Sequence, residues 1–346
     1  MAQDLLSLSR DELAQVLASW GEPEFRSAQI FDWVWKRWVT DFGAMTNLPL
    51  ALRTRLDQTF TPAPLTPLAH QVDEEATEKV LLGLADGEAI EAVLMREGDR
   101  RTVCLSTQVG CPVGCAFCAT GQSRFKRNLT AGEIAGQVLH FARRLAPSER
   151  VTHVVVMGMG EPLFNYAATI KAVRILNDPQ GMGLGARRFT ISTVGVVPGI
   201  LRLAQEGLQV NLAISLHAPE DRLREKLVPT GQKWTIGEIL EAGDAYAQAT
   251  GRRVSYEYVL LGGVNDGLAQ ARALAELLRG RLAHVNLIPF NPAPGLPFAP
   301  PSPSQVDAFR RELVNHGVDA TVRRSRGTRI LAGCGQLRGL STAQQN

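Results

Sequence analysis

Three cysteines stand close together in this 346-residue chain, at Cys111, Cys115 and Cys118, so one short loop can present three thiolates from one side. Thiolates hold iron–sulfur clusters, normally four to a [4Fe–4S] cluster, and three would leave one iron free to chelate a small molecule. Structural zinc needs a closed shell of four ligands, and the next histidine, His140, lies well beyond the loop. The spacing favours a cluster over zinc, and over three free thiols buried as small apolar side chains.

Two further cysteines lie outside this loop. Cys104 precedes Cys111 by seven residues, and Cys334 stands between Gly333 and Gly335 near the C-terminus. The flanking glycines favour a mobile, unhindered thiol at Cys334 that can reach into a site. The two thiols could form a redox pair, although composition alone favours Cys104 as a buried strand residue.

Alternating strands and helices are expected to position these groups. The runs typical of strands are 102–106, 151–157, 189–193, 211–215, 254–261 and 284–288. The patterns typical of helices are 130–145, 166–176, 199–206, 235–249, 268–278 and 304–316. Six strands joined by crossover helices predict an α/β fold with a parallel sheet and right-handed connections.

Polar residues gather where these strands end, which is where parallel sheets bind ligands. The cysteine loop follows the first strand, and Gly158, Gly160 and Glu161 follow the second. Later strands end near Ser192, Ser215, Leu216, His217 and Asn291. Glycines permit close backbone approach to a ligand, and Glu161 could bind a cationic group. His217 alone is more typical of a structural histidine.

Composition restricts the class of protein. Hydrophobic residues make up 45% of the chain and charged residues 21%, which is ordinary for a globular protein. The net charge of +3 is too small to indicate nucleic-acid binding by itself. We see no secretory signal, no membrane-spanning apolar run and no disulfide framework among the five cysteines. Free thiols and an oxygen-sensitive cluster predict that the protein works in the reducing cytoplasm.

Residues 1–70 are expected to form a small helical domain. Ser9 and Glu12 are spaced as a capping box at a helix start, and 61–67 is a proline-rich linker. A second helix over 27–39 carries aromatic residues interleaved with basic ones: Trp33, Trp35, Lys36, Arg37 and Trp38. Such a pattern can stack on bases and neutralise phosphates. The alternative, a hydrophobic core, is at least as well supported for the second and third tryptophans.

Residues 78–95 predict a β-hairpin, because the apolar runs 79–84 and 89–95 flank Asp86-Gly87, a strong turn signal. Glu91 lies inside the second run. It is either exposed on an edge strand or partly desolvated, which would raise its pKa and suit it to proton transfer. The pattern leaves both interpretations open.

The C-terminal part of the chain is basic. From residue 310 onward two acids, Glu312 and Asp319, oppose seven arginines: Arg310, Arg311, Arg323, Arg324, Arg326, Arg329 and Arg338. Clustered arginine suits contact with a phosphate backbone, and residues 124–127 add to it. A solvated helix face explains Arg310 and Arg311 equally well.

The pattern Cys-x-x-x-Cys-x-aromatic-Cys, with Phe117 as the aromatic residue, resembles the signature of the radical S-adenosylmethionine (SAM) enzymes. The resemblance implies a partial (β/α)6 barrel with a small N-terminal helical domain and a basic C-terminal extension. It implies that the three cysteines bind a [4Fe–4S] cluster, that the open iron binds SAM, and that Phe117 lies near the SAM adenine.

Seven motifs resemble one branch of that family, the RNA adenine-C2 methyltransferases: 104–111, 157–163, 191–195, 215–217, 263–266, 286–289 and 334–337. The resemblance covers roughly residues 90–340 and implies a helical accessory domain (1–70), a linker and hairpin (71–98), the barrel (99–317) and a C-terminal extension (318–346). The implied substrates are an adenosine of 23S rRNA at the peptidyl transferase centre and the tRNA adenosine beside the anticodon. A C8-methylating relative is the alternative, and Pro162 favours the C2 branch.

The resemblance also implies roles for individual residues. Cys334 would carry the methyl group as S-methylcysteine, Cys104 would resolve the RNA–protein adduct through a transient disulfide, and Glu91 would accept the C2 proton. The implied SAM contacts are Gly160, Glu161, Ser192, Ser215, Leu216, His217 and Asn291. The resemblance further implies that each turnover uses two SAM molecules and an electron donor such as flavodoxin or ferredoxin. We expect the protein to be a monomer.

The chain departs from the branch just before Cys334, where acidic residues are common and this chain has Arg329 and Leu331. Ala332-Gly333 also stands where two alanines are usual. Two other classes of protein stay open: a radical SAM enzyme that does not methylate RNA, and a zinc-stabilised RNA-binding module without catalysis.

Overall fold

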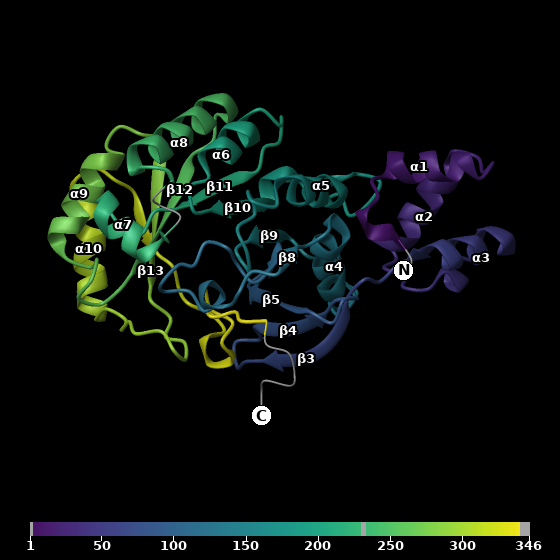
Figure 1. Ribbon diagram of the computed structural model, residues 1–346, viewed down its shortest axis with the longest axis horizontal. Helices are drawn as coiled ribbons and strands as arrows, with labels where there is room; N and C mark the ends of the chain where they lie inside the picture. The colour runs from purple at the N-terminus through teal and green to yellow at the C-terminus, as the bar shows by residue number, and fades with distance from the viewer. Residues whose placement is uncertain (1–2, 230–232, 340–346) are drawn as a thin grey trace.

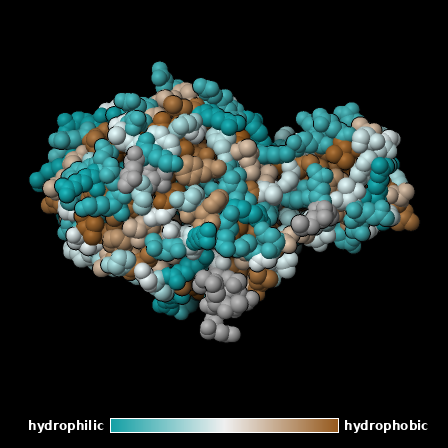
Figure 2. Space-filling model, viewed as in Figure 1, coloured by the Kyte–Doolittle hydropathy of each residue, from teal (hydrophilic) through white to brown (hydrophobic). Residues whose placement is uncertain are grey.

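The computed structural model describes residues 3–229 and 233–339, in two lobes of unequal size (Figure 1). The smaller lobe holds α1 (Arg10–Ser19), α2 (Phe25–Trp35) and α3 (Leu50–Thr59), with the short parallel pair β1 (Gln3–Asp4) and β2 (Phe60–Thr61) at its base. Ser9 and Glu12 form the predicted capping box at the start of α1. In the space-filling view a narrower neck joins the two lobes (Figure 2).

One ten-stranded sheet runs through the larger lobe, in the order β14-β13-β12-β11-β10-β9-β6-β5-β4-β3. Seven neighbouring strands are parallel: β6 (Arg100–Cys104), β9 (His153–Val156), β10 (Phe189–Thr193), β11 (Asn211–Ser215), β12 (Val254–Leu260), β13 (Ala283–Pro289) and β14 (Ala320–Val322). The antiparallel strands β5 (Ala89–Glu97), β4 (Glu78–Gly83) and β3 (Thr66–Val72) extend one side. The pair β7 (Gln108–Val109) and β8 (Arg127–Asn128) flanks the cysteine loop.

Helices connect the parallel strands and lie outside the sheet (Figure 1). They are α4 (Ala131–Ala142), α5 (Tyr166–Asn177), α6 (Val197–Ala204), α7 (Asp221–Leu227), α8 (Ile236–Thr250), α9 (Leu268–Leu278) and α10 (Pro303–Asn315). Apolar side chains of the strands and helices form one continuous core that also reaches into the smaller lobe. No helix in the described residues is long and apolar enough to cross a membrane.

The six predicted barrel strands and six predicted helices are all present, with ends displaced by a few residues. The sequence analysis omitted β14, α7 and α3, and it ended the second helix too late, because Trp38 has a left-handed backbone with φ 57°. The 61–67 linker is also shorter than predicted, since β3 begins at Thr66. Residues 1–2, 230–232 and 340–346, including the end of the predicted C-terminal extension, lie outside the described residues.

The predicted hairpin is β4 and β5, and it belongs to the main sheet. Strand β5 pairs with β4 on one side and β6 on the other, so Glu91 does not lie on an edge strand. Glu91 is 7% exposed. The exposed-edge interpretation is therefore wrong, and the carboxylate is desolvated.

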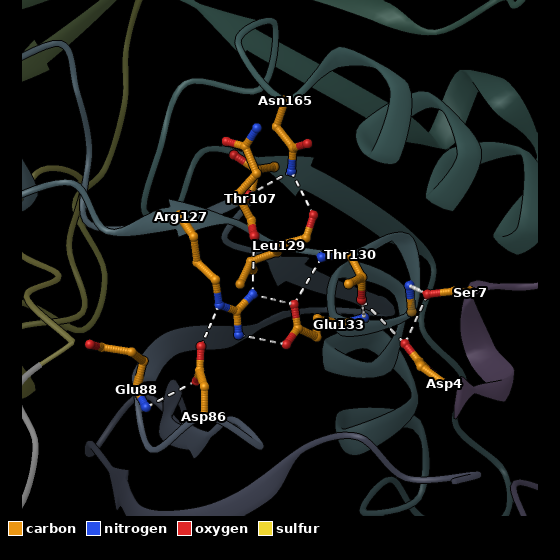
Figure 3. Close-up of polar contacts among 12 residues, drawn as sticks. Asp4, Ser7, Asp86, Glu88, Thr107, Arg127, Leu129, Thr130, Glu133 and Asn165 are labelled. Carbon is orange, nitrogen blue, oxygen red and sulfur yellow. Dashed lines mark hydrogen bonds and ion pairs between the residues drawn. The ribbon is translucent and has the colours of Figure 1, made fainter. Parts of the chain in front are cut away.

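Polar contacts fasten the smaller lobe to α4 (Figure 3). Asp4 accepts a hydrogen bond from the Thr130 hydroxyl at 3.2 Å, and the Ser7 hydroxyl accepts one from the Gly132 amide at 2.9 Å. Nearby, Arg127 pairs with both Asp86 of the hairpin turn and Glu133 of α4. These contacts hold the smaller lobe and the hairpin turn against the same end of one helix.

The C-terminal segment runs from β14 back towards β3 and β4 (Figure 1). Its arginines form ion pairs with acids of the hairpin side: Arg324 with Glu75 at 2.5 Å, Arg326 with Glu97 at 2.9 Å and Arg329 with Glu74 at 2.6 Å. The segment thus joins the two ends of the sheet. Acidic side chains pair with these three arginines in the structure, and their contact with a phosphate backbone stays a prediction.

Candidate active site

A cavity opens at the carboxyl ends of the parallel strands, with about 920 Å³ of free space including its mouth. Its walls come from the cysteine loop, from the ends of β9 to β13 and from the C-terminal segment. Ten of the thirteen residues predicted to form the site line it: Cys111, Cys115, Cys118, Gly160, Glu161, Ser192, Ser215, His217, Asn291 and Cys334.

The three loop cysteines lie on one side of this cavity. Val113, Phe117 and Phe290 belong to the apolar cluster around them. Burial raises the pKa of Cys111 to about 12 and also raises the pKa of Cys115 and Cys118. Ligation of a metal requires the thiolate form, so binding would have to displace these protons.

The donor set fits an iron–sulfur cluster better than a single ion. Within the described residues, no three His, Cys, Asp or Glu side chains converge closely enough to hold one metal ion. The cysteines instead border an open space together with the backbone of Gly158 and Gly160. This arrangement suits a larger group that has its own internal sulfur atoms.

The segment after β9 shapes the cavity floor. Gly160 has φ +102°, and a Cβ there would lie 2.6 Å from Cβ of Gln108, so only glycine fits without strain. Glu161 is buried, and its carboxylate accepts hydrogen bonds from the amides of Val194 (2.8 Å) and Leu163 (3.0 Å). Burial raises the pKa of Glu161 to about 7. Bringing a cationic group beside this carboxylate would favour its charged form.

His217 follows β11 with a left-handed backbone, φ 62°, which is costly for a residue with a Cβ. Its Nδ1 accepts a hydrogen bond from the Val259 amide at 3.0 Å, and its carbonyl accepts one from Asn265 at 2.8 Å. Burial lowers the pKa of His217 to about 3, so the ring is neutral, with its proton on Nε2. The ring meets Phe117 edge-on at 4.7 Å.

Hydrogen bonds dock the Cys334 segment onto the cysteine loop. The Ala119 amide donates to the Gly335 carbonyl at 2.7 Å, and the Thr120 hydroxyl donates to the Leu337 carbonyl at 2.6 Å. Asn291 donates its side-chain amide to the Cys334 carbonyl at 3.2 Å. Cys334 is exposed, as its glycine neighbours predict, and the backbone is anchored at Cys334 and on its C-terminal side.

Cys104 and Cys334 line a second, smaller cavity that adjoins the first, together with Arg323. Burial, and then the proximity of Cys334, raise the pKa of Cys104 to about 12. Arg323 lies near both thiols, and it pairs with the buried Glu257 at 3.3 Å. Cys104 ends strand β6 as a half-buried residue, not a fully buried one as predicted, and it borders the same cavity as Cys334.

Glu91 does not reach either cavity. It lines a third pocket with Lys79, and the two side chains form an ion pair at 2.9 Å. Its other carboxylate oxygen accepts hydrogen bonds from the amides of Arg338 (2.6 Å) and Gly339 (3.1 Å). The carboxylate therefore anchors the chain just beyond Cys334.

Comparison with known proteins identifies the family. Residues 105–275 match the radical SAM superfamily, and residues 3–61 match the N-terminal domain of ribosomal RNA large subunit methyltransferases. Two relatives are described as probable dual-specificity RNA methyltransferases RlmN. The one from Symbiobacterium thermophilum is 50% identical, over 97% of this chain and 91% of its own length. The one from Heliobacterium modesticaldum is 47% identical, over 99% and 91%. The chain belongs to the RlmN family of radical SAM RNA methyltransferases.

A crystal structure agrees with this assignment. A radical SAM methyltransferase from Sphaerobacter thermophilus superimposes with a TM-score of 0.96 at 50% identity, over 98% of this chain and all of that one. The fold predicted by resemblance is therefore confirmed. An RlmN-family enzyme uses an iron–sulfur cluster and SAM and acts on RNA, which agrees with the cavity and its three cysteines.

Leu216 is the one predicted SAM contact of this RlmN-family chain that does not line the cavity. Its side chain is buried in the core, and its amide donates to the Glu257 carbonyl at 3.0 Å. Sequence reasoning missed Glu257 and Lys79 and did not place Arg323 beside the thiols. Arg323 left a signal as part of the arginine cluster. Lys79 left one too, because its partner Glu91 lies on the other strand of the predicted hairpin. Glu257 left none, because its partners Asn286 and Arg323 come from later parts of the chain.

The aromatic and basic residues of the smaller lobe have different environments. Trp35 is 2% exposed and belongs to the core, as the alternative interpretation had it. Trp33 is half-buried, and the Arg37 guanidinium lies 4.2 Å from its ring centre. Trp38 is half-buried against the core. On the larger lobe, Arg124 and Phe125 are exposed beside the cysteine loop.

Proposed function

We propose that this enzyme methylates C2 of an adenine in 23S rRNA, at the peptidyl transferase centre, and of the adenine beside the anticodon in tRNA. The observation that carries the proposal is the position of Cys334, which borders both the cavity of the three loop cysteines and the cavity of Cys104. The dual specificity in the names of the relatives supports two RNA substrates. Such an enzyme would work in the cytoplasm, as a monomer.

Cys111, Cys115 and Cys118 would hold a [4Fe–4S] cluster whose fourth iron stays open for SAM. When bound, the cluster and two SAM molecules per turnover supply a methyl group and the radical that activates it, with an electron from a flavodoxin or ferredoxin. Glu161 would accept the SAM ammonium, and Gly160 would let the ligand approach the backbone. Ser192, Ser215, His217 and Asn291 would complete the SAM site, with Leu216 contributing through its main chain.

The two remaining thiols would carry out the transfer. Cys334 would receive the methyl group on Sγ, and after this group loses one hydrogen atom its carbon would bond to adenine C2. Loss of the C2 proton and of one electron, which offsets the electron supplied at the start, would leave RNA joined to the protein through one carbon. Cys104 would then attack Sγ of Cys334, so that an S–S bond forms and the S–C bond breaks. The electron pair of that bond stays on the carbon, which takes up a proton. A dithiol reductant would supply two electrons to restore both thiols.

Arg323 would favour the resolving step. Its guanidinium lies near both sulfurs and can stabilise the thiolate of Cys104, which burial otherwise disfavours. Glu91 would accept the proton that leaves C2. Because its carboxylate is bound by Lys79 and by the amides of residues 338 and 339, the C-terminal segment would have to shift to expose it.

The target adenine must leave its stack to reach this buried site. Arg124 and Phe125, exposed beside the cysteine loop, and Trp33 with Arg37 on the smaller lobe are our candidates for contacts with the RNA. Stacking and phosphate contacts of this kind hold single-stranded or unpaired nucleotides.

Mapping the methyl position on the product tests the proposal. Anaerobically reduced enzyme, SAM and unmodified 23S rRNA or tRNA should give 2-methyladenosine after nuclease digestion and mass spectrometry. 8-Methyladenosine would instead assign the Cfr-type activity. Absence of methylated adenosine from both RNAs, with a cluster-loaded enzyme that cleaves SAM, would contradict the proposal.

A further inference from the structure

Arg224 is a buried charged residue to which the mechanism above gives no part. It lies in α7 and is 1% exposed. One terminal nitrogen of its guanidinium donates to the carbonyl of Val194 and lies 3.5 Å from that of Ser215, and its buried Nε has no hydrogen-bond partner. No carboxylate in the described residues forms an ion pair with it, and Asp221, on the same helix, interacts only at longer range.

This guanidinium lies behind the cysteine loop. At the end of α7 the Leu227 carbonyl accepts a hydrogen bond from the Ala116 amide at 2.9 Å, which ties the helix to the loop. Leu227 and Val228 pack with Cys115 in the apolar cluster around the cysteines. Burial lowers the pKa of Arg224 to about 10, while the Cys115 thiol acts in the opposite direction.

A buried cation without a counter-charge is costly. Effective penalties for burying an ion amount to several kcal/mol, and two carbonyl contacts offset only part of that. An uncharged side chain with N–H groups could donate to the same two carbonyls with a smaller desolvation penalty. The arrangement therefore suggests an anion that is part of the working protein and that lies on the Cys115 side of the guanidinium.

The cluster site supplies such an anion. Three thiolates around a [4Fe–4S] core of charge 2+ give a net charge of −1, and uptake of one electron makes it more negative. We propose that Arg224 is the buried counter-cation of this site, which favours cluster binding and raises the reduction potential of the cluster. The inference rests on the proposed function, because it requires the three cysteines to hold a cluster.

Arg224 would act as a positioning residue through its charge, and its carbonyl contacts provide the competing explanation. It could simply hold the ends of β10 and β11 together, through Val194 and Ser215. Such a structural role would depend on hydrogen bonds and would not affect the reduction potential of the cluster through a charge. Net charge near a cluster is one of the factors that set its potential.

The test uses three variants of the full-length, cluster-loaded protein: Arg224→Lys, which keeps the charge, and Arg224→Gln and Arg224→Met, which remove it. Arg252→Gln is the matched control. Its Nε is also buried without a partner, and it bonds Asn211 at the opposite end of β11, away from the loop. The midpoint potential is measured by redox titration followed by electron paramagnetic resonance.

We expect the potential to fall in Arg224→Gln and Arg224→Met, to stay near that of the wild type in Arg224→Lys, and to be unchanged in Arg252→Gln. Equal potentials in all variants, or equal shifts in Arg224→Lys and Arg224→Gln, would overturn the inference. Loss of iron during purification of the two neutral variants alone, with retention in Arg224→Lys, would support it as loss of cluster affinity.

Thermal unfolding gives a second readout that does not depend on activity. Without the cluster, Arg224→Met should unfold at the same temperature as the wild type or higher, because replacing an uncompensated ion by an apolar side chain is often stabilising. The rise in unfolding temperature on cluster reconstitution should be smaller in the variant. An equal rise in both would contradict the inference, whereas a wild type that binds no iron and sulfide would contradict the proposed function instead.

Discussion

At the scale of single residues, the site is organised around sulfur atoms in different environments. Cys111, Cys115 and Cys118 share an apolar wall, whereas Cys334 is exposed and Cys104 is half-buried beside Arg323. An exposed thiol can meet a large substrate, and a shielded one reacts only with a group brought to it. The difference in exposure therefore agrees with a carrier at Cys334 and a resolving thiol at Cys104.

Replacing Cys104 should separate these two roles. With Cys104→Ala the carrier can still form its bond to RNA, but no thiol can release it, so a covalent RNA–protein complex should accumulate. Denaturing gels with labelled RNA would detect this complex as a slow band. Cys334→Ala should give neither the band nor methylated RNA, and rapid methylation by Cys104→Ala without any adduct would contradict the assignment.

The buried environment of Cys104 predicts an unusual pH dependence. Its folded pKa of about 12 lies above the unfolded value of about 8.5, since burial disfavours the thiolate. The raised pKa stabilises the folded protein while the thiol is protonated. This contribution to the free energy of unfolding is complete below about pH 8.5 and is lost as the pH rises towards 12. Alkylation of Cys104 by iodoacetamide, followed by peptide mass spectrometry, should still accelerate between pH 9 and about 10.5. A plateau near pH 9 would show an ordinary thiol.

At the scale of elements, the C-terminal segment connects the hairpin side of the sheet to the cysteine loop. Its ion pairs differ in burial: Arg326 is 16% exposed and contacts both Glu75 and Glu97, whereas Arg329 and Glu74 are 74% and 81% exposed. Exposed ion pairs contribute little to stability, and shielded networks contribute more. The pairs around Glu75 should therefore hold the segment.

Charge reversal tests this distinction. Glu75→Lys removes the partner of Arg324 and adds repulsion at Arg326, so amide hydrogen exchange over residues 327–335 should become several-fold faster. Glu74→Lys is the matched control, because it removes only the exposed pair with Arg329, and exchange there should change little. Equal exchange rates in the two variants would show that the hydrogen bonds to the cysteine loop hold the C-terminal segment without the ion pairs of Glu75.

At the scale of the whole molecule, the joint between the lobes depends on one glycine. A Cβ on Gly132 would lie 2.0 Å from Asp4 Oδ2, whereas one on Gly136 of the same helix would lie 3.2 Å from Leu65. Alanine normally stabilises a helix interior relative to glycine by about 1 kcal/mol. At position 132 it would instead displace the Asp4 carboxylate, which bonds Thr130 of the larger lobe.

Gly132→Ala should therefore destabilise the protein by about 1–3 kcal/mol, a typical cost of overpacking. Denaturant unfolding would measure it, with Gly136→Ala as the control that stays near neutral. If the smaller lobe helps to hold RNA, Gly132→Ala should also raise KM for RNA more than it lowers kcat. If Gly132→Ala instead stabilised the protein as much as an ordinary glycine-to-alanine change in a helix, the Asp4 side chain would have moved aside at little cost.

Much of this architecture could be predicted from the sequence, because apolar periodicity and turn residues mark the parallel strands and their helices. Short or charged elements escaped: α7 has seven mostly charged residues, and β14 has three. The cavity followed from the rule that ligands bind at carboxyl strand ends. The pairing of Glu75 with Arg324 and of Glu91 with the amides after Cys334 could not be predicted, since almost 250 residues separate the partners.

The most direct test of the account follows one methyl group through Cys334. Reduced enzyme would be incubated anaerobically with SAM carrying a deuterated methyl group, and the Cys334 peptide would be analysed by mass spectrometry before and after RNA is added. We expect the label on Cys334 first and then, less one deuterium atom, in the methyl group at adenine C2. Methylated RNA carrying all three deuterium atoms, or formed by Cys334→Ala, would contradict the account.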